Sequence, residues 1–383
     1  MPKKQHKLIS SPFTAIFQLV LSVFLLSSTL AYGQWEVLSI KTAVNMRGVH
    51  AVTPTICWIG GSDGTVLRTI NGGKSWSVFK IPGSDSLDFR DIHAFGRETA
   101  VAMSSGLAET GRAKIYRTED SGETWNLVYQ STQTGVFLDG IDFWNKEQGI
   151  CLGDPLNGKL FVLTTEDGGK SWQELPVENR PEGQPGEASF AASGTSILAV
   201  GKDKAFIGTG GGKMARVFRS EDKGRHWQVS ETPMPAGPTS GIFGLHFWSK
   251  KNGIAVGGDY KNISDTTRNV LLTDDGGITW KFGTSTKPLG LKEGVALYHK
   301  RYSTWNGDTQ IRADDVALVA VGPSGSSSSV NQGKTWIPVG SEPFHAVSFA
   351  GNVGYAVGGK GLIGKIEKVS RKKKRKKLVF TDQ

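Results

Sequence analysis

The stretch Thr69-Ile70-Asn71-Gly72-Gly73-Lys74-Ser75-Trp76 decides the fold, because its pattern returns along the chain. The pattern is Ser or Thr, any residue, Asp or Asn, any residue, Gly, two further residues and Trp. Its acidic or amide positions are Asn71, Asp120, Asp167, Asp222, Asp275 and Asn331, which follow one another at intervals of 49, 47, 55, 53 and 56 residues. Repeats of about 40–50 residues are typical of β-propeller blades. The spacing therefore indicates one repeated unit and not several unrelated domains.

Each copy of the pattern has the chemistry of a tight turn between two strands. The Asp or Asn side chain can accept N–H groups of its own turn. The Gly tolerates a positive φ that other residues resist, and the Trp buries a large ring at the start of the next strand. We therefore expect these residues to close β-hairpins and to have a structural, not a catalytic, role.

Strand-like segments recur at matching distances from the turns. Second strands end in Gly, as at 57–61, 254–258 and 355–359, and third strands follow, from 66–68 to 362–366. The expected inner strands are 47–52, 90–95, 139–144, 188–193, 243–248, 293–298 and 345–350.

The seventh unit ends before its turn, but residues 34–38 (Gln-Trp-Glu-Val-Leu) match the strand that follows each turn. The N-terminal segment is therefore expected to complete the last blade and hide its open edge. The sequence thus predicts an all-β, seven-bladed β-propeller over residues 34–370, with the ring closed by the N-terminal strand.

The first 33 residues have the layout of a secretory signal peptide. Lys3, Lys4 and Lys7 precede an apolar run over 13–30, and Ala31-Tyr32-Gly33 provides small residues before a cleavage site. An uncleaved membrane anchor is the alternative, although the run is short for a span of about 20 residues. The sequence predicts export to the periplasm, the cell surface or the extracellular space.

The formal charge of +10 lies mostly at the two ends of the chain. The first 33 residues carry three lysines, residues 371–383 carry a net +6, and only +1 remains for residues 34–370. A near-neutral body argues against a nucleic-acid partner. The basic segment 371–377 is expected to be disordered and to stay solvated or contact an anionic membrane surface.

The chain shows no cofactor or transition-metal motif. Its two cysteines, Cys57 and Cys151, lie in apolar runs and are expected to be buried and unpaired. The seven histidines show no pair at ligand spacing. We therefore expect no cofactor and no transition-metal site, while calcium held by loop oxygens stays an open alternative.

Candidate functional residues lie on the face opposite the turns. In a propeller this face carries the loops from second to third strand and from blade to blade, here 104–114, 153–155, 176–188, 208–212 and 258–268. Long loops on a rigid scaffold are where binding concentrates. The residues expected around the central channel mouth are Asp139, Asp154, Glu187, Asp259, Glu293, Arg47, Arg90, Arg216, Tyr260 and His345. They form either a polar ligand pocket or ion pairs that only rigidify the loops.

The repeated turns resemble the Asp box, or BNR repeat. On this basis the chain resembles the photosystem II stability/assembly factor-like propellers within the BNR/sialidase-type superfamily. The stretches 153–155 (Gly-Asp-Pro), 186–196 (Gly-Glu-Ala-Ser-Phe-Ala-Ala-Ser-Gly-Thr-Ser), 208–211 and 257–260 resemble a branch of secreted bacterial proteins that are often named oxidoreductases. The chain has no dinucleotide fingerprint, redox cysteine pair or haem motif to support that label. The resemblance implies a propeller scaffold with an interaction role, and the arginine triad, Tyr nucleophile and acid/base pair of sialidases have no residue-by-residue match here.

Three hypotheses for function follow. The first is an exported, non-catalytic, monomeric propeller that binds a protein or glycan through its loop-rich face, with an assembly or scaffold role at the cell envelope. The second is a carbohydrate-active enzyme that uses Asp139, Glu187 and Asp259, which requires two carboxyl groups about 5–5.5 Å or about 6.5–9.5 Å apart across a cleft. The third is an anion-binding pocket formed by Arg47, Arg90 and Arg216.

Overall fold

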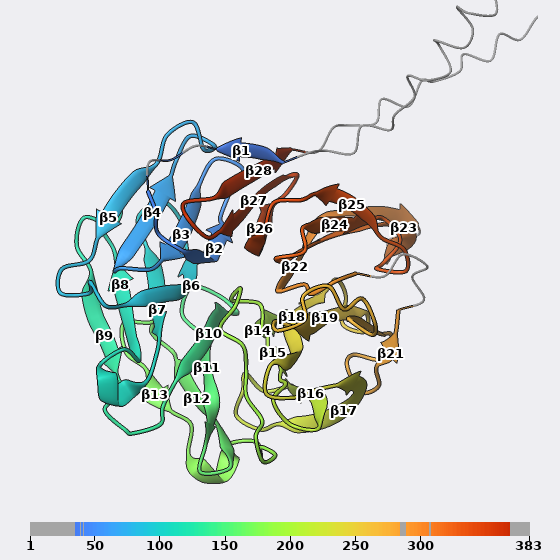
Figure 1. Cartoon of the computed structure of the whole chain (residues 1–383), viewed down its shortest axis with the longest axis horizontal. Helices are drawn as coiled ribbons and strands as arrows, with labels where there is room; N and C mark the ends of the chain where they lie inside the picture. Colours follow the sequence, from blue (N-terminus) through green and yellow to red (C-terminus); the bar gives the residue numbers. More distant parts are fainter. Residues whose placement is uncertain (1–34, 39, 41, 284–288, 306–307, 368–383) are drawn as a thin grey trace, which may run out of the picture.

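The fold is a closed ring of seven four-stranded antiparallel sheets (Figure 1). The computed structural model describes residues 35–38, 40, 42–283, 289–305 and 308–367. The expected signal peptide (1–33) and basic tail (371–383) lie outside the described residues. The structure confirms the predicted all-β, seven-bladed propeller.

Each blade runs from an inner strand at the centre of the ring to an outer fourth strand. Blades 1 to 3 are β2 (Met46–Ala51), β3 (Cys57–Gly61), β4 (Thr65–Thr69) and β5 (Ser77–Lys80); β6 (Asp88–Ala94), β7 (Ala100–Ser105), β8 (Lys114–Thr118) and β9 (Asn126–Gln130); and β10 (Leu138–Phe143), β11 (Gly149–Leu156), β12 (Lys159–Thr165) and β13 (Gln173–Glu174). Blades 4 and 5 are β14 (Ile197–Val200), β15 (Lys204–Gly208), β16 (Met214–Ser220) and β17 (Gln228–Pro235); and β18 (Ser240–Phe247), β19 (Gly253–Asp259), β20 (Val270–Thr273) and β21 (Lys281–Phe282).

Blades 6 and 7 complete the ring. They are β22 (Gly294–Trp305), β23 (Asp308–Val321), β24 (Ser326–Ser329) and β25 (Ile337–Gly340); and β26 (Phe344–Ala350), β27 (Val353–Gly358), β28 (Ile363–Glu367) and β1 (Glu36–Leu38). Two 3₁₀ turns, Ala108–Thr110 and Val177–Asn179, lie in the connections. Across the described ranges, no helix has the length and apolar character to cross a membrane.

The N-terminal strand closes the ring as predicted. β1 pairs with β28 in the register Glu36↔Lys365, Val37↔Gly364 and Leu38↔Ile363. Trp35, which precedes β1, is buried and packs on Phe344 with ring centroids 5.1 Å apart. The first and last segments of the ring are thereby held together in one sheet.

The six repeated turns share one set of hydrogen bonds. In each turn the Asp or Asn Oδ1 accepts the N–H of the residue four positions later, at 2.9–3.0 Å. The Ser or Thr hydroxyl at the start accepts the N–H of the second Gly position, at 2.8–3.0 Å. In the second turn, hydrogen bonds to the Asp120 carboxylate lower its pKa to about 2, and the bond from the Thr124 hydroxyl contributes most. The turn residues are thus occupied within their own hairpins.

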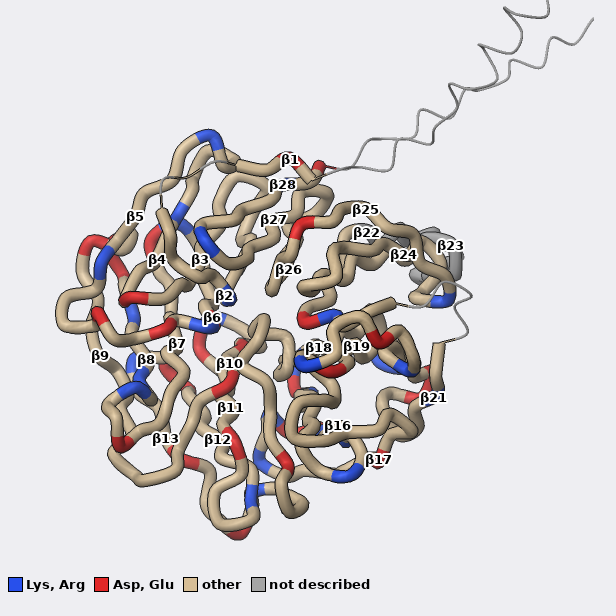
Figure 2. Tube along the Cα trace, in the orientation of Figure 1, with Lys and Arg blue, Asp and Glu red and all other residues tan. Residues whose placement is uncertain are grey.

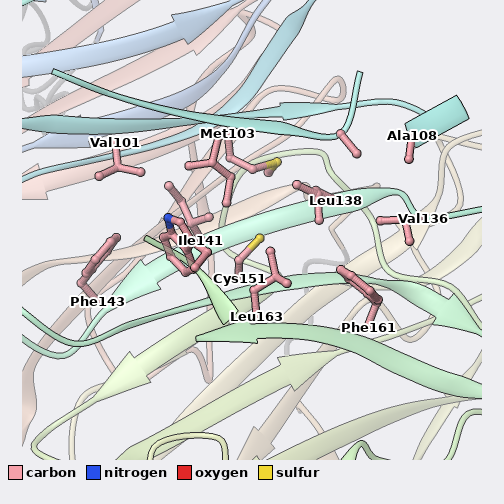
Figure 3. Packing of buried hydrophobic residues seen from close by; sticks show 13 residues of the cluster. Val101, Met103, Ala108, Val136, Leu138, Ile141, Phe143, Cys151, Phe161 and Leu163 are labelled. Atoms are coloured by element: carbon pink, nitrogen blue, oxygen red, sulfur yellow. The ribbon is translucent and has the colours of Figure 1, made fainter. Parts of the chain in front are cut away.

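The hydrophobic core is divided among the interfaces between neighbouring blades. Figure 3 shows one of them, in which side chains of β7 pack against those of β10, β11 and β12. Met103, Leu138, Cys151 and Phe161 are fully buried there. Burying such a side chain contributes about 1.5–3 kcal/mol. Each blade therefore depends on its neighbours for stability.

The predicted inner strand at 188–193 is wrong. The inner strand of blade 4 is β14 (Ile197–Val200), and residues 188–196 form a loop, here called the crossing loop. Ala188, Phe190 and Ala192 recur at every second position, as apolar residues do in a β-strand. In the structure, however, these side chains pack against other parts of the ring. Gly186 and Gly194 bound the segment with φ of +75° and +74°, in a region that strands do not use. The expected inner strand at 293–298 is also longer than predicted, because β22 and β23 extend as one hairpin.

We predict that Trp35→Ala destabilises the ring by about 3–5 kcal/mol, the usual cost of removing a buried aromatic side chain. The indole lies against the backbones of Gly340 and Gly364, where a Cβ would meet it at 2.8 and 3.1 Å. Urea unfolding measures the effect. Val37→Ala is the control, because this β1 side chain is 51% exposed and its loss should change stability by less than about 0.5 kcal/mol. Equal effects of the two substitutions would contradict the closing role of Trp35.

Candidate functional site

Five inner strands carry a β-bulge near their first residues. The register shifts between the first and third residues of β2, β10 and β26, between the second and fourth residues of β6, and between the third and fifth residues of β18. The residues left between the shifted pairs are Arg47, Arg90, Asp139, His345 and Phe243. A bulge re-aims the side chain of its extra residue. Four of these five are polar residues that the sequence places at the channel mouth, and Figure 2 shows charges of both signs around the ring centre near β6, β10 and β18.

Three predicted mouth residues from different blades meet in one cluster. Glu293 Oε2 lies 2.5 Å from His345 Nδ1 and 3.6 Å from Arg47 Nη1. Burial lowers the pKa of Arg47, while the charge of Glu293 acts in the opposite direction. The Arg47 side chain keeps 26% of its surface exposed. The cluster is therefore an ion-paired group that still presents a cation to solvent.

Arg90 connects this cluster to blade 3. Its Nε donates to Asp88 Oδ2 at 2.7 Å, and its side chain is 34% exposed. Its charge lowers the pKa of Arg47 on one side and the pKa of Asp139 on the other. The structure therefore brings together predicted mouth residues of blades 1, 2, 3, 6 and 7.

Asp139 and Asp154 form a buried carboxyl pair on neighbouring strands of blade 3. Asp139 is 1% exposed, and neither of its carboxyl oxygens has a hydrogen-bond partner among the described residues. Burial and then the charge of Asp154 raise the pKa of Asp139 well above its ordinary value. Burial also raises the pKa of Asp154 to about 6, although the Ser189 N–H donates to its Oδ1 at 2.8 Å. The pair thus favours holding protons over carrying two negative charges.

The crossing loop contacts Asp154 of this pair and reaches residues of blades 2, 5 and 6. Ser193 Oγ donates to the Glu293 carbonyl of blade 6 at 2.7 Å, and Phe190 stacks on Phe243 of blade 5 at 3.9 Å. On the blade 2 side, a Cβ added to Gly194 would lie 2.3 Å from Asp91 Oδ1. Contacts with several blades therefore hold this loop in place.

Glu187 and Arg216 form a separate buried ion pair in blade 4. Glu187 Oε1 accepts from Arg216 Nε at 2.9 Å and from the Thr209 hydroxyl at 2.6 Å, and Oε2 accepts from Arg216 Nη2 and from the Gln184 N–H at 2.7 Å. Arg216 also donates to the Glu182 carbonyl. Both side chains are thereby committed to holding the loop base. Arg47 and Arg90 remain as the predicted arginines at the mouth.

Asp259 and Tyr260 lie at the rim of the same face. Asp259 Oδ1 accepts from the Thr239 hydroxyl at 2.7 Å and from the Lys261 N–H at 2.8 Å. Tyr260 is 45% exposed and meets Phe190 edge-on, with centroids 6.4 Å apart. Of the predicted acid/base residues, Asp139, Glu187 and Asp259 therefore occupy three different surroundings. The two carboxyls that influence one another electrostatically, Asp139 and Asp154, come from adjacent strands of one blade.

Within the described part of the chain, no group of three or more His, Cys, Asp or Glu residues could hold a metal ion. Cys57 and Cys151 are free and buried, and burial raises the pKa of both thiols well above the ordinary value. Neither thiol is therefore disposed toward redox chemistry.

Sequence reasoning missed a second set of polar residues along the inner strands. The Ile141 N–H donates to Asp91 Oδ2 at 2.7 Å, the Ala94 N–H to His50 Nδ1 at 2.9 Å, and the Ala199 N–H to Asp142 Oδ2 at 2.7 Å. Each bond joins one blade to the next, so these residues fasten the ring. Their signal in the sequence is a polar residue inside an apolar inner strand.

We predict that Glu187→Gln destabilises the protein by about 3–5 kcal/mol, because it leaves the buried Arg216 charge without its partner. The matched control is Glu166→Gln, since Glu166 pairs with Arg225 at 3.2 Å on the surface and should contribute less than about 1 kcal/mol. Chemical unfolding measures both. The double variant Glu187→Met/Arg216→Met should recover most of the loss. A single variant as stable as the control would contradict the structural role of this pair.

We predict a pH-dependent stability difference between the protein and Asp139→Asn. Because burial raises the folded-state pKa of Asp139, its contribution to stability is present below the unfolded pKa and is lost as pH rises toward the folded pKa. The neutral Asn lacks this loss, so the stability of the variant relative to the parent should increase from pH 4 to pH 8. Unfolding at several pH values measures the difference. A difference that does not change with pH would contradict a raised pKa.

Comparison with known proteins agrees with this architecture. Residues 100–240 match the family model described as photosynthesis system II assembly factor YCF48. The photosystem II assembly lipoprotein Ycf48 of Synechococcus sp. is 24% identical over 176 residues, covering 44% of this chain and 50% of the relative. That of Trichormus variabilis is 26% identical over 308 residues, covering 70% and 81%. The chain thus spans half the length of the first relative and about four fifths of the second.

A solved structure described as YCF48 bound to D1 peptide has the same fold. It superposes with a TM-score of 0.58 over 88% of this chain and 96% of that chain, at 14% sequence identity. The predicted resemblance is confirmed: this chain is a seven-bladed propeller similar to the photosystem II assembly factors of the YCF48 family.

Proposed function

We propose that the chain is an exported, monomeric, protein-binding propeller that contributes to the assembly of a complex at the cell envelope. The observation that carries this proposal is the convergence of bulge-borne side chains at the centre of one face. A rigid ring that presents such residues is suited to recognition, because little conformational freedom is lost on binding.

The loop-rich face offers the chemistry of a protein interface. Arg47 and Arg90 are partly exposed cations at its centre, with 26% and 34% of their side-chain surface exposed, and Tyr260 and Ile263 expose 45% and 41% of their surface at the rim. Arg and Tyr are the residue types that dominate binding energy at interfaces. A partner segment that brings a carboxylate to the two arginines and an apolar side chain to the rim fits this arrangement.

Similarity to assembly factors supports a binding role. The curated relatives are named photosystem II assembly lipoproteins, and a solved YCF48 is described as bound to D1 peptide. The carbohydrate-active alternative has less support, because Glu187 is bound to Arg216 and Asp259 to Thr239. Glycan binding remains an outcome that the experiment below distinguishes.

The proposed export rests on the leader-like pattern of residues 1–33 and on the lipoprotein names of the relatives. Cys57 and Cys151 are both fully buried in strands. Neither is therefore available for lipid attachment in the folded propeller.

We predict that a photo-crosslinking residue at Tyr260, introduced in the source organism, forms an adduct with another protein. The matched control position is Val330, which is also 45% exposed but lies in a repeated turn on the opposite face. Arg47→Ala and Arg90→Ala together should lower the Tyr260 adduct at least about tenfold, as expected for interface residues that contribute more than about 1.4 kcal/mol. Mass spectrometry and saccharide staining identify the adducts. Equal protein adducts at both positions, or saccharide adducts alone, would contradict the proposal.

A further inference from the structure

A buried lysine without an acidic partner lies on the loop-rich face, outside the channel mouth. Lys292 precedes β22 and is 2% exposed. Its Nζ donates to Ser324 Oγ at 3.0 Å and to the Gly325 carbonyl at 2.7 Å. Among the described residues, no carboxylate forms an ion pair with this amine. Lysine is almost never fully buried unless it is paired with an opposite charge, so the position requires an explanation beyond packing.

The hydroxyl in contact with this amine belongs to an exposed residue. Ser324 lies between β23 and β24 and is exposed, whereas Lys292 lies behind it. Ser324 Oγ also donates to the Leu291 carbonyl at 3.0 Å. When Nζ is neutral, rotation of the hydroxyl from the Leu291 carbonyl toward Nζ would direct its proton at a base 3.0 Å away, as activation of a serine nucleophile requires.

Apolar surface adjoins the hydroxyl. A Cβ added to Gly290 would lie 2.9 Å from Ser324 Oγ and 2.6 Å from the Ile263 carbonyl oxygen, so Ser324 and Ile263 flank one point of the surface. The Leu291 N–H donates to the same Ile263 carbonyl at 3.1 Å, which fixes the loop there. Ile263 is 41% exposed and Tyr260, on the same loop, is 45% exposed.

We propose that Ser324 and Lys292 form a nucleophile–base dyad that hydrolyses carboxylic esters with a short apolar acyl group. Ser324 is the nucleophile and Lys292 the general base, and the exposed Ile263 side chain contacts the acyl chain. This activity uses none of Arg47, Arg90 or Tyr260 and shares only Ile263 with the proposed protein-binding face.

The amine is prepared for proton transfer near neutral pH. Burial lowers the pKa of Lys292 to about 8, so this amine loses its proton closer to neutral pH than an ordinary lysine does. The neighbouring charged groups are directed elsewhere. Glu293 binds Arg47 and His345, Asp259 accepts from Thr239 and Lys261, and Asp265 accepts from Thr267.

The reaction conserves atoms and protons in two steps. Neutral Lys292 Nζ removes the Ser324 proton as Oγ attacks the ester carbonyl carbon. The tetrahedral intermediate collapses, the C–O bond to the alcohol breaks, and the alcohol takes the proton from Nζ. Water then attacks the acyl-serine while Nζ takes its proton. Collapse returns that proton to Ser324 and releases the carboxylic acid.

The test is hydrolysis of p-nitrophenyl butyrate by the propeller from pH 6 to pH 10. The rate should rise about tenfold per pH unit at low pH and level off near pH 8. Ser324→Ala and Lys292→Met should each lower the plateau rate by about 100-fold or more, the range of general base catalysis. Ser264→Ala is the matched control, because Ser264 is exposed on the neighbouring loop and its hydroxyl donates to Asn262 at 3.2 Å.

A fluorophosphonate probe provides a second measurement. Mass spectrometry should find the phosphonyl group on Ser324 in the parent and in Ser264→Ala, and on no residue of Ser324→Ala. Ser324→Ala removes one acceptor of the Lys292 amine but leaves its bond to the Gly325 carbonyl, so thermal unfolding should show that this variant stays folded even if Lys292→Met is destabilised. A Ser324→Ala variant as active as the parent, or a probe attached elsewhere, would overturn the proposal.

Discussion

The pairing of β1 with β28 is the constraint on which the rest of the structure depends. A propeller blade buries its apolar faces only against its neighbours, so an open ring would leave two faces and two edges unprotected. The three residue pairs between β1 and β28, together with the packing of Trp35 on Phe344, cover these faces and edges. A closed ring in turn fixes the seven inner strands around one axis. The positions of the bulge residues at the mouth follow from that geometry.

The centre of the ring is a place where charge is paired or neutralised. Glu293 is held between Arg47 and His345, whereas Asp139 lies under the crossing loop without a hydrogen-bond partner among the described residues. Desolvation of an unpaired carboxyl is expensive, and the group responds by a raised pKa. The two halves of the mouth therefore differ. One presents cations to solvent, and the other holds two carboxyls whose pKa values are raised by burial.

The sequence predicts the scaffold well because the scaffold repeats. Six turns with the same residues indicate the hairpins, and Gln34 to Leu38 resembles the strand after each turn closely enough to predict the closing strand. Blade 4 shows the limit. The alternation at 188–193 is that of a half-buried strand, and only contacts from other blades, such as Phe190 on Phe243, distinguish a crossing loop from a strand. Lys292 is similar, because nothing local in the sequence places it behind Ser324, 32 residues later.

The order of the strands around the ring also has a consequence for how the protein is made. β1 is the first strand to be synthesised, and its partner β28 is the last. Contacts between such distant segments form slowly, since a long loop must close before they contribute. A chain that leaves the ribosome or a translocation pore from its N-terminus can build blades 1 to 6 in sequence. The final closure must wait for the segment that contains β28, so blade 7 stays incomplete while the other blades can already pack against one another.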